Sequence, residues 1–208
     1  MKQQNSNNNS KNALIIFTRN PELGKVKTRL AATVGNQSAL EIYEFLISHI
    51  VKVSENTTVD KYVFYSEIIQ ENDAWNSEIF RKKLQHGNDL GDRMHHAFQQ
   101  LFKVGYEKVV IVGSDIYELN QQDIEAAFQT LETDDVVIGP AKDGGYYLLG
   151  IRELNSALFR NKKWGTHTVF EETMSDLQNE KVSLLAVKSD VDVYEDIENI
   201  EAFQKYII

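Results

Sequence analysis

Four cations gather within one loop of an otherwise acidic chain. They are Arg19, Lys25, Lys27 and Arg29. The loop contains Pro21 and Gly24 and follows an apolar run at 13–17, which we expect to be a buried strand. A strand, a basic glycine-containing loop and a helix form a phosphate site in many α/β proteins, because backbone N–H groups and the helix N-terminus add positive charge. The segment has neither a Walker loop nor a Gly-x-Gly-x-x-Gly pattern, and a solvated basic loop is the alternative interpretation.

Carboxylates follow the predicted ends of two strands. A run of β-branched residues at 109–112 leads through a glycine and a serine to Asp115, while Asp190 and Asp192 follow an apolar segment at 182–187. In open α/β sheets the ligand crevice lies outside the carboxyl ends of the strands. Because carboxylate oxygens suit Mg²⁺ or Mn²⁺, these three aspartates are candidate metal ligands. For Asp115 the alternative is a turn or a helix cap.

Two polar, glycine-containing segments add further candidates. The segment 85–94 precedes a helical pattern, and its Asp89 and Arg93 are either ligand contacts or a helix cap and a surface residue. In the segment 140–150, Asp143 precedes two glycines and an apolar run, which indicates a tight turn into a strand. Asp143 is therefore either the first residue of that turn or a carboxylate that faces a ligand.

The elements that must position these residues alternate along the chain. Periodicity predicts strands at 13–17, 61–65, 109–112, 135–139, 146–150 and 182–187. It predicts helices at 37–53, 73–83, 94–102, 124–131 and 169–177, and a C-terminal helix through 197–203. This alternation favours an α/β protein, a three-layer α/β/α sandwich with a mostly parallel mixed sheet.

Composition narrows the function. A chain of 208 residues fits one domain, which we place at 13–208 after a disordered polar tail at 1–12. The absence of cysteine excludes thiolate metal sites and cysteine nucleophiles. A net charge of −9 argues against nucleic acid as the partner. With no signal peptide pattern and no apolar run of about 18 residues, we expect a cytoplasmic protein without a membrane span.

Four ordered motifs resemble one bacterial family. They lie at 17–30, 113–115, 139–150 and 190–196. The match resembles the radical-SAM-associated transferases, which are commonly labelled glycosyltransferases and include an arsenosugar-biosynthesis branch. That family belongs to the nucleotide-diphospho-sugar transferase superfamily, so the resemblance implies the GT-A type fold over essentially the whole folded chain.

The resemblance also implies roles on the nucleotide side. The basic loop would hold the nucleotide diphosphate through Lys25, Lys27 and Arg29. Asp115 would correspond to the metal-binding aspartate of the superfamily, and Asp192, with Asp190 beside it, to the second metal position. The segment 87–93 would help to enclose the nucleotide. Mg²⁺ or Mn²⁺ is the implied cofactor.

On the opposite side, the resemblance implies contacts with the sugar or the acceptor. That side would be lined by Asp143, Gly144 and Gly145. Trp164 could stack on a base or a sugar, or simply pack against the core. The sequence departs from the family pattern at Tyr117, where proline is usual, and at Gly165, where serine is common.

Three functions are compatible with these residues. The first is a glycosyltransferase that moves a sugar from a nucleotide-diphosphate donor to a small-molecule acceptor, with Asp143 as a candidate base. The second is a nucleotidyltransferase that transfers a nucleotide from an NTP to a phosphorylated small molecule. The third is a nucleotide-binding regulator without turnover. We expect the glycosyltransferase.

Overall fold

The computed structural model describes residues 10–207. Residues 1–9 of the predicted tail lie outside this range, and the first strand starts at Asn12. The division into a tail and one domain stays a prediction. Among the described residues, none of the helices combines the length and the hydropathy needed to traverse a bilayer.

A seven-stranded sheet forms the middle layer, in the order β3-β2-β1-β4-β6-β5-β7. The strands are β1 Asn12–Thr18, β2 Asp60–Tyr65, β3 Phe80–Leu84, β4 Lys108–Gly113, β5 Val136–Pro140, β6 Tyr146–Ile151 and β7 Val182–Leu184. Strand β6 is antiparallel to β4 and β5, and every other pairing is parallel. The predicted fold class, an α/β protein with a mostly parallel mixed sheet, is therefore confirmed.

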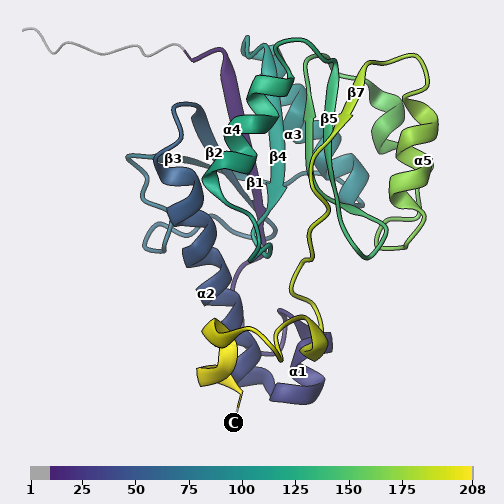
Figure 1. Ribbon diagram of the computed structural model, residues 1–208. Coiled ribbons are helices and arrows are strands. Elements are labelled where there is room, and N and C mark those ends of the chain that lie inside the picture. Colours follow the sequence, from purple (N-terminus) through teal and green to yellow (C-terminus); the bar gives the residue numbers. More distant parts are fainter. Residues whose placement is uncertain (1–9, 208) are drawn as a thin grey trace, which may run out of the picture.

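Helices cover both faces of this sheet (Figure 1). The α-helices are α1 Thr28–Val34, α2 Asn36–Glu55, α3 Leu90–Lys103, α4 Gln121–Thr130 and α5 Val169–Asp176, and 3₁₀ helices span Ser156–Phe159, Tyr194–Asp196 and Glu201–Tyr206. Alternate residues of β1 enter different cores: Leu14 packs with α2 and α4, whereas Ile15 packs with α3. A strand buried on both faces explains the continuous apolar runs in the sequence.

A smaller apolar cluster, which we call the terminal core, lies below the sheet. Its buried members are Leu30, Ile42, Leu46, Val191, Ile197 and Phe203. Figure 1 shows α1 and the C-terminal segment packed beside the first half of α2, beyond the lower edge of the sheet. The cluster matters for function because it carries the end of the basic loop and the segment that contains Asp192.

Three predicted elements differ from the structure. The helix expected at 73–83 is wrong: turns lead into β3, because Phe80 is buried against Trp75 with ring centroids 5.1 Å apart and β3 pairs with β2. The expected C-terminal helix consists of separate 3₁₀ helices. Strand β7 ends at Leu184, since it pairs with β5 over only three residues.

Candidate active site

The loops that follow β1 and β4 meet below the sheet, because these two strands are neighbours in parallel register. The hydroxyl of Tyr43, on α2, fastens them together. It accepts a hydrogen bond from the backbone N–H of Arg19 at 2.8 Å and lies 3.0 Å from the hydroxyl oxygen of Ser114. Burial raises the pKa of Tyr43 above its ordinary value, so this hydroxyl stays neutral. The sequence analysis treated Tyr43 as scaffold; its one signal was a polar-tipped ring in an aliphatic stripe.

Lys27 lies between two of the predicted aspartates. Its side chain is only 6% exposed, and Nζ lies 2.7 Å from Oδ2 of Asp115 and 3.5 Å from Oδ1 of Asp192. Arg29, which is 72% exposed, also forms an ion pair with Asp192. Cations of the basic loop therefore already compensate two of the three carboxylates that the sequence assigned to metal.

A polar pocket of about 740 Å³ opens in front of these residues. Eight predicted site residues line it: Arg19, Lys25, Lys27, Arg29, Asp89, Arg93, Asp115 and Asp192. Five Lys and Arg side chains line it together with four carboxylates, and the cations offer hydrogen-bond donors to the oxygens of an anionic group.

Some of these lining residues also have structural partners. Asp89 caps α3, since its carboxylate accepts a hydrogen bond from the backbone N–H of Asp92 at 2.8 Å. The Nε–H of Arg93 donates to the carbonyl oxygen of Gly87 at 3.3 Å. Lys25 is 57% exposed and pairs with Glu22. The capping alternative for Asp89 is therefore confirmed, and a ligand role would add to it.

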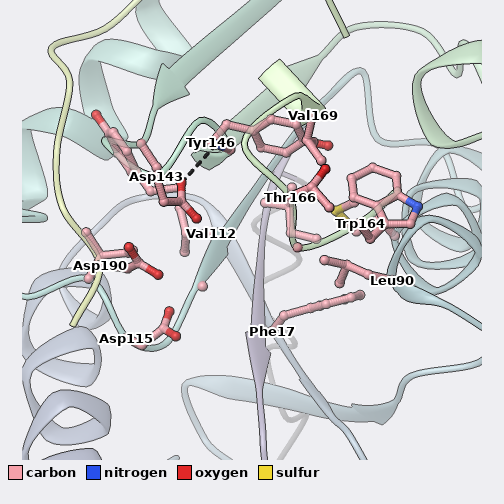
Figure 2. Close-up of a pocket in the computed structure, with 18 residues that line it drawn as sticks. Phe17, Leu90, Val112, Asp115, Asp143, Tyr146, Trp164, Thr166, Val169 and Asp190 are labelled. Carbon is pink, nitrogen blue, oxygen red and sulfur yellow. Dashed lines mark hydrogen bonds between the residues drawn. The ribbon is translucent and has the colours of Figure 1, made fainter. Parts of the chain in front are cut away.

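A second pocket of about 210 Å³ adjoins the first, and we call it the apolar pocket. Figure 2 shows Asp115, Asp143 and Asp190 on one side of it, with Phe17 and Trp164 on the other. Both pockets share the lining residues Phe17, Leu90, Gly113 and Asp115. Asp115 is therefore the carboxylate that a molecule spanning the two pockets would pass.

The apolar pocket contains an electrostatically strained carboxylate. Burial first, and then the nearby charges of Asp115 and Asp143, raise the pKa of Asp190 above its ordinary value. Among residues 10–207, however, no group of three or more His, Asp or Glu side chains converges closely enough to hold a metal ion. Two carboxylates, Asp115 and Asp190, are enough for Mg²⁺ only when a substrate is bound, because this ion is commonly held by one or two carboxylates together with substrate phosphates and water.

The predicted glycines divide into one that faces the site and two that shape loops. Gly145 lines the apolar pocket, and its N–H donates to Oδ1 of Asp143 at 2.8 Å. Gly24 and Gly144 line neither pocket and have φ values of +75° and +90°. A Cβ on Gly144 would lie 2.2 Å from the carbonyl oxygen of His167, so only glycine fits there.

Gly91 lies in the segment 87–93, which the resemblance assigned to the nucleotide, but its contact with Trp164 shapes the apolar pocket. It is buried at the start of α3, and a Cβ built on it would lie 2.4 Å from Nε1 of Trp164 and 2.3 Å from the carbonyl oxygen of Phe159. The absence of a side chain at Gly91 thus lets the indole pack against the helix and form a wall of the apolar pocket. Nothing in the sequence pairs residue 91 with residue 164.

Comparison with known proteins identifies the family. The model of DUF2064, described as uncharacterized proteins conserved in bacteria, matches residues 49–166, which is more than half of the chain. The chain belongs to the DUF2064 family. The matched stretch of this DUF2064 protein includes Asp115 and Asp143, whereas the basic loop and Asp192 lie outside it. No functionally curated protein matches the chain.

Solved structures place the DUF2064 protein in a superfamily. A protein from Desulfovibrio desulfuricans G20, provisionally described as a nucleotide-diphospho-sugar transferase, is 32% identical over 88% of this chain and 83% of its own, with a TM-score of 0.82. CMP:2-keto-3-deoxy-manno-octonic acid synthetase in complex with CTP is 13% identical, over 96% of this chain and 100% of its own, with a TM-score of 0.57. Mycobacterium tuberculosis Rv0371c in complex with manganese is 11% identical, over 95% and 98%, with a TM-score of 0.55.

The two distant similarities concern the fold alone. Together with the Desulfovibrio protein they show that this DUF2064 member has the fold of the nucleotide-diphospho-sugar transferase superfamily. The predicted enzyme class, a transferase, is confirmed at that level. Which group it transfers belongs to the proposal that follows.

Proposed function

We propose that this DUF2064 protein is a glycosyltransferase that moves a sugar from a nucleotide-diphosphate donor to a small-molecule acceptor. The observation that carries the proposal is that the cations of the site lie in only one of the two connected pockets. All five Lys and Arg side chains of the site line the polar pocket. The described lining of the apolar pocket contains no Lys, Arg or His and three aspartates. The diphosphate therefore belongs to the polar pocket, and the other reactant carries no phosphate.

The residues of the two pockets supply the groups that the reaction needs. Lys27 and Arg29 face the place where charge develops on the departing diphosphate and would stabilise it. The acceptor hydroxyl attacks the anomeric carbon and transfers its proton to the carboxylate of Asp143. The bond between the anomeric carbon and the β-phosphate oxygen breaks, and the nucleoside diphosphate leaves with the electron pair.

Mg²⁺ or Mn²⁺ is the proposed cofactor, held by Asp115 and Asp190. These carboxylates are the hard oxygen donors that such ions prefer. Burial first, and then the nearby charges of Asp115 and Asp143, raise the pKa of Asp190, and Lys27 offsets only part of that rise. When bound, the ion would neutralise charge on the diphosphate. The manganese in the Rv0371c structure supports this choice. Asp192, which the sequence also offered as a metal ligand, is not included in the proposed metal site, because it pairs with Lys27 and Arg29.

Nucleotidyl transfer is the second candidate, and the CTP complex of a protein with the same fold supports it. In that reaction a phosphate of the acceptor attacks the α-phosphate of an NTP, and pyrophosphate leaves. Asp143 disfavours it, because this carboxylate of the apolar pocket would face a phosphorylated acceptor and the described lining supplies no Lys, Arg or His to pair with the phosphate. We also propose, from the motifs, the radical-SAM-associated branch of the superfamily and a cytoplasmic location, with no nucleic acid as substrate.

The deciding experiment compares donors and products. Nucleotides and nucleotide-sugars are screened by thermal shift with Mn²⁺ and with EDTA; a ligand at a hundred times its Kd stabilises by about 2.7 kcal/mol. Arg29→Met should weaken diphosphate binding by about tenfold, because a charge-assisted hydrogen bond contributes roughly 1.5–3 kcal/mol. Lys52→Met removes an exposed cation outside the pocket and should have no effect. Release of nucleoside diphosphate supports glycosyl transfer, whereas release of pyrophosphate from an NTP contradicts it.

A further inference from the structure

The apolar pocket indicates the class of acceptor, an inference that rests on the proposed function. We propose that the acceptor is a neutral alcohol whose ring-sized apolar body fills the apolar pocket while its hydroxyl group faces Asp143. The size of the cavity supports one ring. At about 210 Å³ it exceeds the roughly 150 Å³ of an engineered apolar cavity that binds benzene.

The walls of the pocket suit a flat apolar group. Tyr146 and Trp164 stand nearly perpendicular, at 88°, with ring centroids 6.4 Å apart, and Phe17 closes the adjoining side. Leu90, which is 44% exposed, lies where the two pockets meet. Aromatic walls of this kind bind rings through offset or edge-to-face contacts. The body of the acceptor is therefore apolar rather than a chain of hydroxyls.

The indole wall of the pocket is fixed in place before any ligand arrives. Trp164 packs against the start of α3 at Gly91, where even a methyl group would overlap its Nε1. A wall held in this way costs little entropy when a ring binds, since it does not have to become ordered. The pocket is thus preorganised for an occupant of defined shape.

Charge then selects the polar group of the acceptor. Asp115, Asp143 and Asp190 form the acidic side of the pocket (Figure 2). Lys27 pairs with Asp115, and the proposed metal would bind Asp115 and Asp190, so Asp143 is the carboxylate left to face the acceptor. The described lining offers no Lys, Arg or His to an anionic acceptor. Phosphates and carboxylates are repelled, whereas a hydroxyl group donates a hydrogen bond to Asp143. A protonated amine would also be attracted but has no lone pair with which to attack the sugar. A neutral alcohol is the acceptor that satisfies both the walls and the chemistry.

The test uses the two tryptophans of the chain as reporters. Trp164 lines the apolar pocket, and Trp75 is buried in a different core. Indole N–H signals are recorded by ¹H–¹⁵N NMR and assigned with Trp164→Phe. Benzyl alcohol should shift the Trp164 signal at millimolar concentration and leave the Trp75 signal in place. With EDTA present to remove divalent metal, benzyl phosphate should bind on the order of tenfold more weakly, because it meets like charges.

A charge reversal sharpens the test. Asp143 is exposed, so Asp143→Lys should fold, and it should narrow or invert the preference for benzyl alcohol over benzyl phosphate. Equal or tighter binding of the phosphate by the natural protein overturns the proposal, as does a Trp164 signal that neither compound shifts. The nucleotide screen is a separate readout. If no nucleotide or nucleotide-sugar stabilises the protein but benzyl alcohol binds as expected, the result counts against the proposed function. If a nucleotide-sugar binds but benzyl alcohol does not shift the Trp164 signal, the result counts against the acceptor class alone.

Discussion

Lys27 has an uncommon backbone conformation for a residue at the centre of a candidate site. With φ of 47° and ψ of 45° it is left-handed, a region that non-glycine residues occupy at some cost. The reason lies in its side chain, which reaches Asp115 and Asp192 from the residue just before α1. The ion pairs hold the loop, and the loop presents its other cations to the polar pocket.

Replacing Lys27 by methionine should therefore lower the free energy of unfolding by about 1–3 kcal/mol, because two largely shielded carboxylates lose their charged partner. Chemical denaturation measures this. The matched control is Lys25→Met on the same loop: Lys25 pairs only with Glu22 at the surface, and such pairs contribute roughly 0–1 kcal/mol. Added Mn²⁺ should raise the free energy of unfolding of Lys27→Met by more than it raises that of the natural protein. Equal losses in the two variants would contradict a special role for Lys27.

At the scale of elements, Asp134 helps to fasten the edge strand of the sheet. Asp134, just before β5, accepts hydrogen bonds from Lys181 at 2.8 Å and from the hydroxyl of Ser183 at 2.6 Å, and so attaches the three-residue strand β7. Hydrogen bonds from Lys181, Ser183 and Thr133 lower the pKa of Asp134 from 3.8 to about 2. The folded state therefore favours the ionised form.

This shift predicts how stability depends on pH. Because the folded pKa is depressed, the contribution of Asp134 is present above its unfolded pKa and disappears as the pH falls through its folded pKa. The difference in unfolding midpoint between the natural protein and Asp134→Asn should be largest above about pH 5 and should vanish near about pH 2. If the difference in unfolding midpoint between the two proteins persists at low pH, the charge of Asp134 is not what attaches β7, and the packing or neutral hydrogen bonds of this side chain attach it instead.

Elements buried on both faces could be predicted from sequence, since β1 and β4 are continuous apolar runs. Strand β3 could not, because three consecutive basic residues, Arg81 to Lys83, disguise an edge strand. Phe80 at its start is buried in the core, and Leu84 at its end packs against the same core. Basic and acidic residues near strand ends identified eight of the residues that line the polar pocket. Their partners could not be predicted, because the pairing of Lys27 with Asp115 spans 88 positions.

At the scale of the whole molecule, the cations of the candidate site are supported both by the sheet and by the terminal core. The chain carries a net charge of −9, yet five cations line one pocket. Such a local patch can attract a nucleotide despite an acidic surface, and its attraction weakens with salt. Two of these cations, Lys27 and Arg29, are tied to Asp192 on the segment that enters the terminal core. The nucleotide side of the site therefore depends on a part of the molecule outside the main sheet.

Phe203 tests this dependence. It is buried in the terminal core, with ring centroids 4.9 Å from Tyr117 and 5.4 Å from Phe45. Tyr117 follows β4 and packs on Phe203, so this position joins the loop after β4 to the terminal core. Phe203→Ala should remove about 3–5 kcal/mol of local stability. Hydrogen exchange should then show lost protection in α1 and the first half of α2, while β1 and β4 stay protected.

The same substitution should weaken nucleotide binding, because Arg29 and Asp192 lose their common support. Phe128→Ala provides the comparison: Phe128 is buried on α4 in the core above, so its loss should destabilise the sheet and leave nucleotide affinity unchanged while the protein is folded. Uniform loss of protection in Phe203→Ala would show instead that the terminal core and the sheet unfold as one unit. The affinity would then follow global stability, and the two substitutions would have the same effect. A selective loss would make the terminal core the element that sets the position of the cations against the donor.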